Sequence, residues 1–280
     1  KNGDIDIACD LAGEGIEEIK ADNNLVMSQE PGMGVNYIYF NMENGPTADI
    51  KVRKALQMAV DRDAMCAALY QYGECSPAYL PLPPASWGYD ESLEDLVPKY
   101  DVEGAKKLLA EAGYPEGFEL EYYTSDSASS KKIGEILQQF CAKVNVKVNI
   151  HQASWGTFSE IGASGNADAI GMSWTWFPDP YFYLNKMFHE ESLGTLGNGQ
   201  QFNIPEVNEL LDKAVEVSDQ EERAKLYKEA LKLIVEQYPQ IDYCLANINT
   251  GLNKKVQNYV VRPDKTIEIA GDGHNVWLAK

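Results

Sequence analysis

Six aromatic rings fall within eleven consecutive residues, 174 to 184, in the sequence WTWFPDPYFYL. The same stretch contains two prolines and a single carboxylate, Asp179. Trp and Phe rings transfer no protons, but their faces bind flat or apolar partners by stacking and by burial from water. The stretch therefore predicts either a sealed part of the protein core or a surface that binds a ligand through rings.

The rings differ in their distance from the end of a predicted strand, residues 167–174. We expect Trp176 and Phe177, just past that end, to line a ligand cleft, whereas Trp174 fits the core and the cleft equally. Asp179 is the one carboxylate that can meet a ligand here. Because Pro180 follows it, Asp179 also fits the cap of a helix.

A second candidate wall is the segment TSDSASSK, which contains Thr124, Ser125 and Asp126. Its small residues let a ligand approach the backbone, and the start of the following helix favours a carboxylate. An ordinary solvated turn is the alternative. Trp155 opens another helix beside the same sheet edge, where it contributes a ring or packs in the core, and Asn41 at the crossing strand is a further candidate.

Helical and strand periodicities alternate between residues 100 and 245. Helical spacing is found at residues 101–113, 131–144, 154–163, 205–217 and 219–237, and strand spacing at 118–124, 146–150 and 167–174. This alternation predicts an α/β fold with crossover connections and helices on both faces of one sheet. In open sheets of this class, ligands bind at the carboxyl ends of the strands.

Local signals place several boundaries. Asp101 and Asp219 are natural N-caps, Gly113 fits the position after a helix end, and Pro205 fits a first turn. The proline-dense residues 76–89 predict an extended, ordered loop. Both ends of the chain differ from the helical middle: the first thirty-odd residues have strand-and-turn character, and IDYCLANI, NYVVRP and HNVWLAK predict short strands.

Composition excludes several classes of function. The 24 basic and 43 acidic residues give a net charge of −19, which disfavours binding to nucleic acids. No run approaches the roughly 18 apolar residues of a membrane span. The sequence lacks the GxSxG, Walker A, HExxH and GxGxxG patterns, and its three histidines are far apart. We therefore predict a binding protein without catalytic residues, metal or cofactor.

The five cysteines are scattered and form no CxxC pair. Cys141 and Cys244 lie in apolar surroundings, so we expect two buried thiols. Cys66 and Cys75 are close enough in sequence to pair, but the spacing leaves their state open, and the odd number of cysteines argues against a complete disulfide framework.

Several segments together resemble the family 5 extracellular solute-binding proteins, the dipeptide-, oligopeptide- and nickel-binding receptors of ABC importers. The resemblance is carried by GDIDIA, YIYFNMEN, IKVRKALQMAVDRDAMCAALYQYGECSPAYLPLPP, YDVEGAKKLLAEAGYPEGF and NIPEVNELLDKAVEVSDQEERAKLYKEALKLI. It implies a periplasmic-binding-protein-like lobe. It also implies an extracytoplasmic, often lipid-anchored protein whose partners are a permease and an ATPase.

Family members are much longer than this chain, so the resemblance implies a carboxyl-terminal portion, an expressed fragment that lacks most of lobe I. We expect residues 35–245 to form lobe II, and residues 1–34 and 246–280 to belong to the hinge and lobe I. Ligand capture then requires the missing lobe, because the two lobes close around the ligand.

One subsite departs from the pattern of the family. In peptide-binding members, the motif similar to WTWFPDPYFYL carries an aspartate a few residues before the Asp-Pro pair, and this aspartate holds the peptide's α-amino group. Here Trp176, Phe177 and Pro178 occupy those places. The departure favours a peptide without a bare amine at this subsite, or a glycoside or aromatic solute. A glycoside hydrolase and a peptide-sensing or adhesive surface protein of the same fold are the alternatives.

Overall fold

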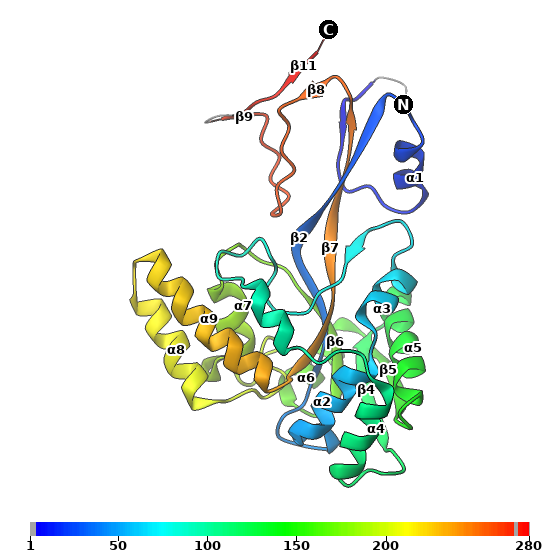
Figure 1. The fold of residues 1–280 in the computed structure, drawn as a ribbon, viewed down its shortest axis with the longest axis vertical. Coiled ribbons are helices and arrows are strands. Elements are labelled where there is room, and N and C mark those ends of the chain that lie inside the picture. The colour runs from blue at the N-terminus through cyan, green and yellow to red at the C-terminus, as the bar shows by residue number, and fades with distance from the viewer. Residues whose placement is uncertain (1–3, 272–273, 280) are drawn as a thin grey trace.

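The computed structural model describes residues 4–271 and 274–279, so the predicted end segments 1–34 and 246–280 contain residues outside the described part. The chain forms a larger unit of helices around a sheet and a smaller unit that holds both chain ends (Figure 1). Two long antiparallel strands, β2 (Leu25–Phe40) and β7 (Gln240–Asn253), run through both units.

The main sheet combines antiparallel and parallel pairs. Its order is β1-β7-β2-β6-β4-β5, and β3 pairs with β7. The other strands are β1 (Ile7–Ala8), β3 (Cys75–Ser76), β4 (Glu119–Ser125), β5 (Lys147–Ala153) and β6 (Ala169–Trp174). Strand β4 lies parallel to β5 and β6, whereas β2 runs antiparallel to β6, so β4, β5 and β6 share one direction.

Helices cover both faces of this sheet, which confirms the predicted α/β architecture. The helices of the larger unit are α2 (Ile50–Ala59), α3 (Arg62–Leu69), α4 (Val102–Glu111), α5 (Ala128–Ala142), α6 (Trp155–Ser164), α7 (Tyr181–Phe188), α8 (Pro205–Glu216) and α9 (Gln220–Glu236). Short 3-10 helices occur at η1 (Pro46–Ala48), η2 (Glu91–Leu96) and η3 (Glu190–Ser192).

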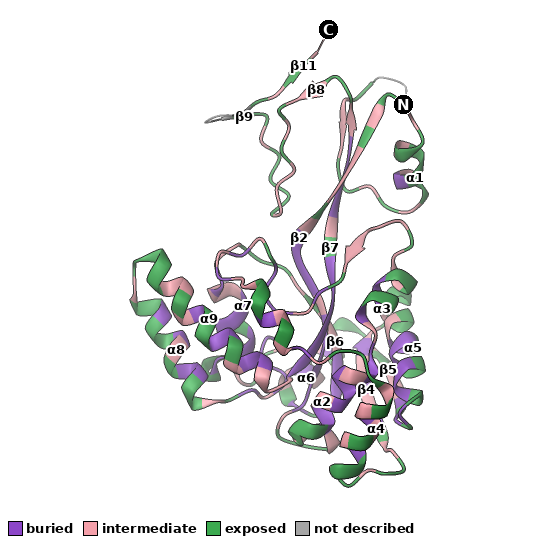
Figure 2. Cartoon of the chain, in the orientation of Figure 1, coloured by how far each residue is buried: buried purple, intermediate pink, exposed green. Residues whose placement is uncertain are grey.

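Two separate cores arise from the alternation of side chains along β2. Tyr37 and Tyr39 point to one face and pack in the core that contains residues of α7, α8 and α9. Ile38 and Phe40 point to the other face and pack with residues of α2, α4 and α5. Because successive side chains of a strand face opposite sides, one strand contributes to both cores. The buried residues of β2, β7 and the helix faces turned toward the sheet are visible in Figure 2.

Two predicted helix caps, Asp101 and Asp219, are confirmed. The Asp101 side chain accepts a hydrogen bond from the Gly104 N–H at 2.9 Å, and Asp219 accepts one from Glu222 N–H at 2.9 Å. Helix α5 begins before the predicted residue 131, because the Ser127 side chain accepts from the Ser130 N–H and recruits part of the serine-rich segment into the first turn.

The ends of the chain differ from expectation. The predicted strand pieces around IDYCLANI form part of the single 14-residue strand β7, whereas NYVVRP forms no strand. A helix, α1 (Glu14–Lys20), interrupts the predicted strand-and-turn lead-in. The smaller unit also contains the short strands β8 (Val256–Gln257), β9 (Ala270–Gly271), β10 (His274–Asn275) and β11 (Trp277–Leu278). Strand β8 pairs with β11, and β9 pairs with β10.

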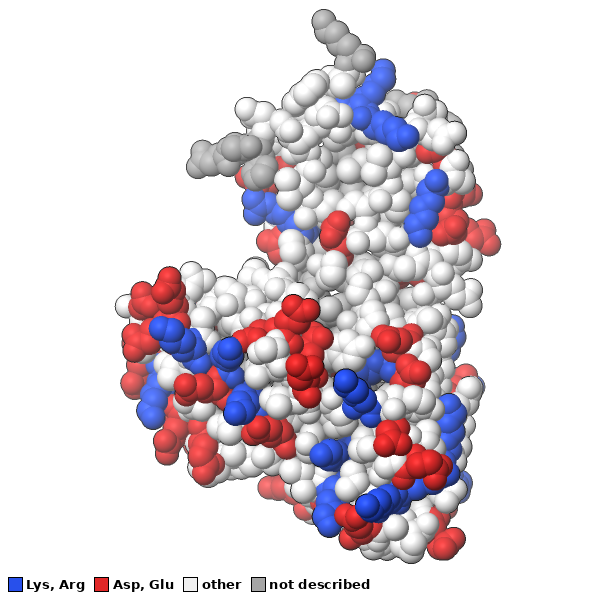
Figure 3. All heavy atoms as spheres, in the orientation of Figure 1, with Lys and Arg blue, Asp and Glu red and all other residues white. Residues whose placement is uncertain are grey.

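Charged side chains are interspersed over the surface. In the view of Figure 3, acidic groups gather on parts of the larger unit and no continuous basic area is visible. Among the described helices, none combines the length and the apolar character that a bilayer crossing requires.

Two glycines provide a test of the turns around β4. Gly117 has φ +82°, and a Cβ there would collide with the backbone carbonyl of Asn145. We expect Gly117→Ala to lower the free energy of unfolding by ~2–3 kcal/mol, from the strained φ and the collision together. The matched control is Gly113→Ala, with φ +94° and open space around the Cβ, for which only the ~1 kcal/mol conformational cost is expected. Urea denaturation measures both, and equal losses would contradict the collision argument.

Candidate ligand-binding cleft

The carboxyl ends of β4, β5 and β6 face the smaller unit. Ser125 lies in register with Ala153, and Trp174 lies opposite Val35 on β2. Strand β2 descends from the smaller unit into the larger one (Figure 1), so the antiparallel β6 and its parallel neighbours end toward the smaller unit. The segments that follow these three strands contain most of the predicted ligand-binding residues.

The aromatic stretch divides between the surface and the interior, as the sequence left open. Trp176 is 49% exposed and Phe177 is 60% exposed. Their ring centroids lie 6.2 Å apart, and each ring also contacts Phe182. Trp174 is half-buried against the core, its indole N–H donates to the Phe182 carbonyl at 2.8 Å, and its ring stacks on Trp176 at 6.4 Å. The half-buried Trp174 ring thus packs against the exposed Trp176 ring on the side of the core.

The backbone of this stretch is held by buried groups. The Tyr183 hydroxyl donates to the Met33 carbonyl at 2.7 Å and accepts from the Trp176 N–H at 3.1 Å. Tyr183 is fully buried, so this pair of bonds ties the ring-bearing segment to β2. A firmly held backbone limits the conformational entropy that this segment of the chain would lose on binding a ligand.

Asp179 has protein partners for its carboxylate. One oxygen accepts from the Tyr181 N–H at 3.0 Å, at the start of α7, and the other lies 3.2 Å from the Arg223 guanidinium. Arg223 also packs over the Trp87 ring at 5.1 Å. The N-cap residue of α7 is Pro180 and not Asp179, which corrects the expectation that Asp179 caps this helix. Since the Asp179 charge is already balanced, we assign this residue to the turn that precedes α7 rather than to a ligand amine.

This assignment predicts the phenotype of Asp179→Ala. We expect the free energy of unfolding to fall by ~1–2 kcal/mol, because the variant loses the acceptor of the Tyr181 N–H and leaves the Arg223 guanidinium without its ion-pair partner. Asp126→Ala is the control, because Asp126 is exposed in the loop after β4 and a surface change should remain within ~0.5 kcal/mol. Chemical denaturation decides. A loss of ligand affinity without a loss of stability would return Asp179 to the ligand site.

A cavity of about 260 Å³ lies at the ends of β4 and β6. Three of the residues that the sequence singles out, Thr124, Ser125 and Trp155, line this cavity, whereas Asp126 is exposed and lies outside its lining. The lining residues that the sequence did not single out are Asn36, Tyr70, Tyr122, Ser129, Ser130, Ile133, Phe158, Gly171, Met172, Ser173 and Tyr243. These residues come from β2, β4, β6, β7, α5, α6 and the segment after α3, so no local pattern marks them.

The lining of this cavity is rich in hydroxyl groups and contains no charged residue among those described. Tyr122 is fully buried, and beyond an approach to the Thr124 side chain its hydroxyl has no hydrogen-bond partner within the described residues. Burial raises the pKa of Tyr122, so the group stays protonated and can donate. Ser125 and Ser130 add hydroxyls 2.7 Å apart at the start of α5. The cavity therefore suits a polar, uncharged group or a carboxylate.

Asn41 lies elsewhere. It follows the far end of β2, where Phe40 pairs with Ala169 rather than with the strand ends near Trp174. Asn41 is 2% exposed, its amide donates to the Gly165 carbonyl, and its Oδ1 accepts from the N–H groups of the next turn. The structure gives Asn41 a turn-forming role, which corrects the prediction that it meets a ligand.

A larger cavity, of about 340 Å³, contains no residue of β4, β5 or β6. Its walls come from residues 60–63 at the start of α3, from Tyr79 and from the segment between residues 94 and 100, and they carry both acidic and basic side chains. We therefore place the candidate ligand site at the smaller cavity and the exposed rings, where strand ends and predicted residues coincide.

Comparison with known proteins relates this arrangement to other chains. Residues 1–194 match the family described as bacterial extracellular solute-binding proteins, family 5 Middle. Heme-binding protein A of Haemophilus influenzae is 34% identical over 89% of this chain and 46% of its own length. The dipeptide-binding protein of Escherichia coli is 30% identical over 89% of this chain and 47% of its own. The chain thus spans about half the length of the curated relatives it matches.

Solved structures share the fold. HbpA2 from Haemophilus parasuis superposes with a TM-score of 0.87 at 30% identity, covering 95% of this chain and 52% of that one. DppA from Helicobacter pylori, in complex with the peptide STSA, superposes with a TM-score of 0.79 at 25% identity, covering 99% of this chain and 53% of that one.

Proposed function

Because the chain belongs to the bacterial extracellular solute-binding proteins of family 5, we propose that it is part of the substrate-binding component of an ABC importer and helps to capture a peptide or peptide-sized solute. The observation that carries this proposal is the pairing of two exposed rings, Trp176 and Phe177, with an uncharged, hydroxyl-lined cavity at the same strand ends. The relatives are named as binding proteins, so we propose capture without turnover, in preference to glycoside hydrolysis.

We propose that the two long strands, β2 and β7, connect two lobes. Residues 35–245 are lobe II, and residues 1–34 and 246–280 lead from and to a counterpart lobe. Strands β2 and β7 are the hinge, where their register shifts between Pro31 and Val35. A solute binds one lobe, the other lobe rotates onto it, and the closed form docks on a permease and its ATPase. A protein with this role acts outside the cytoplasm, so we propose a location in the periplasm or, as a lipoprotein, on the outer face of the membrane.

The contacts of the site narrow the class of solute. A ligand ammonium needs a free carboxylate, but Asp179 is paired with Arg223. Stacking on Trp176 and Phe177 suits a side chain or a flat solute instead. We therefore propose a peptide that places no bare amine at this subsite. The exposed rings favour, as a second candidate, a flat aromatic or glycosidic solute, and the name of the Haemophilus influenzae relative adds heme to that class.

A binding screen tests the proposal. A longer chain that includes the counterpart lobe should show a thermal shift with members of one solute class among peptides, glycosides, heme and metal chelates. The 280 residues alone should show no tight binding by calorimetry, because they supply one wall of the site. Tight binding by the 280 residues alone would overturn the two-lobe proposal, and turnover of a glycoside would favour the hydrolase.

A further inference from the structure

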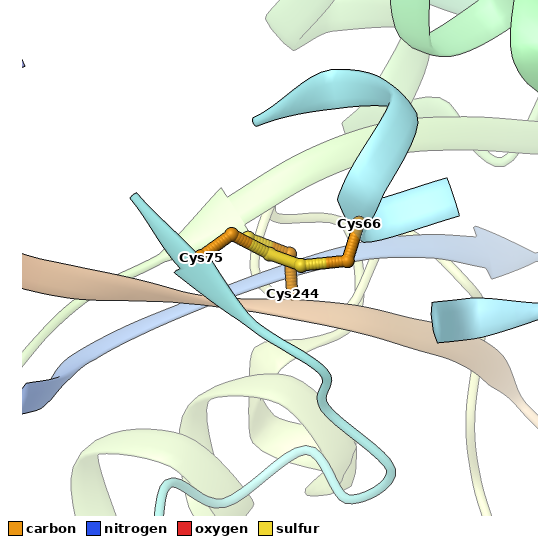
Figure 4. Close-up of side chains that lie close together, drawn as sticks. All are labelled: Cys66, Cys75 and Cys244. Carbon is orange, nitrogen blue, oxygen red and sulfur yellow. A yellow bond between two sulfur atoms is a disulfide. The ribbon is translucent and has the colours of Figure 1, made fainter. Parts of the chain in front are cut away.

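A disulfide and a free thiol lie together next to residues that line the candidate ligand cavity. Cys66 of α3 and Cys75 of β3 are joined by a disulfide, and Cys244 of β7 is free and fully buried. The three sulfur atoms lie within 4.8 Å of one another (Figure 4). The expectation that Cys244 is a buried thiol is confirmed, but the sequence did not reveal its neighbours.

The position of β7 places Cys244 beside both ends of the disulfide. Strand β3 pairs with β7 through Cys75 and Ala246. Cys244 lies two residues before Ala246, so the side chains of Cys244 and Ala246 point to the same face of β7, where Cys75 is paired. Cys66 approaches that face from α3, which packs against β7. A third sulfur this close to a disulfide is in range to attack it after a small movement of the side chains.

The thiol also contacts the candidate ligand cavity. The Asn36 side-chain amide donates to the Cys244 sulfur at 3.3 Å, and Tyr70 also forms a hydrogen bond with it. Asn36, Tyr70 and the adjacent Tyr243 all line the cavity. A change in the bonding of Cys244 therefore acts directly on the cavity wall.

We propose that Cys66, Cys75 and Cys244 form a thiol–disulfide exchange site in which the disulfide moves onto β7. The Cys244 thiol loses its proton, its sulfur bonds to one sulfur of the disulfide, and the other sulfur leaves as a thiolate and takes up a proton. One S–S bond forms as another breaks, so the step needs no oxidant or reductant. This inference goes beyond solute capture and stands independently of the ligand.

The exchange is slow while Cys244 stays buried and protonated. Burial raises the pKa of Cys244 to about 12, and only the thiolate attacks a disulfide. The hydrogen bonds from Asn36 and Tyr70 oppose this effect of burial. The fraction of thiolate rises about tenfold per pH unit below the pKa, so exchange should accelerate as the pH is raised from 7 to 9.

The first test replaces one cysteine of the disulfide and measures whether the remaining cysteine forms a disulfide with Cys244. In a Cys9→Ser background, which eliminates the exposed thiol, acid denaturation and alkylation without reductant should label two thiols, Cys141 and Cys244. Adding Cys66→Ser leaves Cys75 and Cys244 as two thiols, and in aerated buffer, where dissolved oxygen accepts the two electrons and two protons, they should form a Cys75–Cys244 disulfide that is found in the mass spectrum and leaves only Cys141 to be labelled. The control with Cys66→Ser and Cys244→Ser should label Cys75 and Cys141. Three labelled thiols in Cys66→Ser after incubation in aerated buffer, with a native circular dichroism spectrum, would contradict pairing of Cys244 with Cys75. The variant Cys75→Ser tests the pairing of Cys244 with Cys66 under the same conditions.

The second test keeps the disulfide and does not depend on the folding of either variant. The Cys9→Ser chain is held at pH 7 or pH 9, quenched in acid, alkylated and digested. A peptide that links Cys244 to Cys66 or Cys75 should accumulate faster at pH 9, with matching alkylation of the released cysteine. The absence of any Cys244-linked peptide at both pH values and in both variants would overturn the proposal.

Discussion

Trp176→Ala, in a chain that includes the counterpart lobe, should weaken solute binding by ~1–3 kcal/mol, or roughly 5- to 150-fold, with little change in the melting temperature. The side chain is 49% exposed at the strand ends, so it contributes little to the core but presents a flat face to a solute. Calorimetry with the solute selected by the thermal-shift screen measures the affinity, and a thermal scan without solute measures the stability.

Trp174→Phe is the matched control for that experiment. Trp174 packs against the core, and its indole N–H donates to the Phe182 carbonyl. Removing this donor should cost ~1–3 kcal/mol of stability, because the carbonyl loses its partner in a half-buried place. If Trp176→Ala lowered the melting temperature and left the affinity unchanged, the ring at 176 would belong to the core and the proposed ligand site would be wrong.

Asp242→Asn should change the pH dependence of stability far more than the substitution of an exposed carboxylate. Asp242 lies on β7 with 3% of its surface exposed, and its carboxylate accepts a hydrogen bond from the Gln240 amide. Burial raises the pKa of Asp242 from 3.8 to about 7, although the nearby Arg62 guanidinium opposes the effect. Asparagine keeps the acceptor oxygen and removes the titration.

The sign of the effect follows from the raised pKa. Between pH 4 and pH 7 the native chain holds the Asp242 proton more tightly than the unfolded chain does. The contribution of Asp242 is therefore fully present below pH 4, is lost as the pH rises toward 7, and is constant above it. At ~1.4 kcal/mol per pKa unit, the loss amounts to about 4 kcal/mol.

Urea denaturation of both chains at several pH values isolates this group, because all other carboxylates are common to the two. The stability of Asp242→Asn relative to the parent should rise by about 4 kcal/mol between pH 4 and pH 7. Asp126→Asn, at an exposed position, is the control for the effect of the substitution itself. Parallel curves for the parent and Asp242→Asn would show that the carboxylate ionises normally despite its burial.

The helical middle of the fold was predictable because its signals are local. The apolar spacing of α8 and α9, the caps at Asp101 and Asp219, and the alternation in β4 each involve residues within a few positions of one another. The chain ends were harder to predict. Strand β7 is one continuous ladder because β2 pairs along almost its whole length, and no short window of sequence contains that partner.

In the candidate ligand site, too, some features follow from local sequence and others depend on contacts between distant segments. The succession of helices and strands along the chain and the position of the rings after one strand follow from the sequence pattern, since side-chain periodicity depends on neighbouring residues alone. Contacts between distant segments decided the rest. Arg223 neutralises Asp179 from 44 residues away, and Asn36, Tyr122 and Tyr243 meet at one cavity from three different strands. The Cys66–Cys75 pair likewise lies beside Cys244 because β3 and α3 both pack on β7, a proximity that exists only once the sheet has formed.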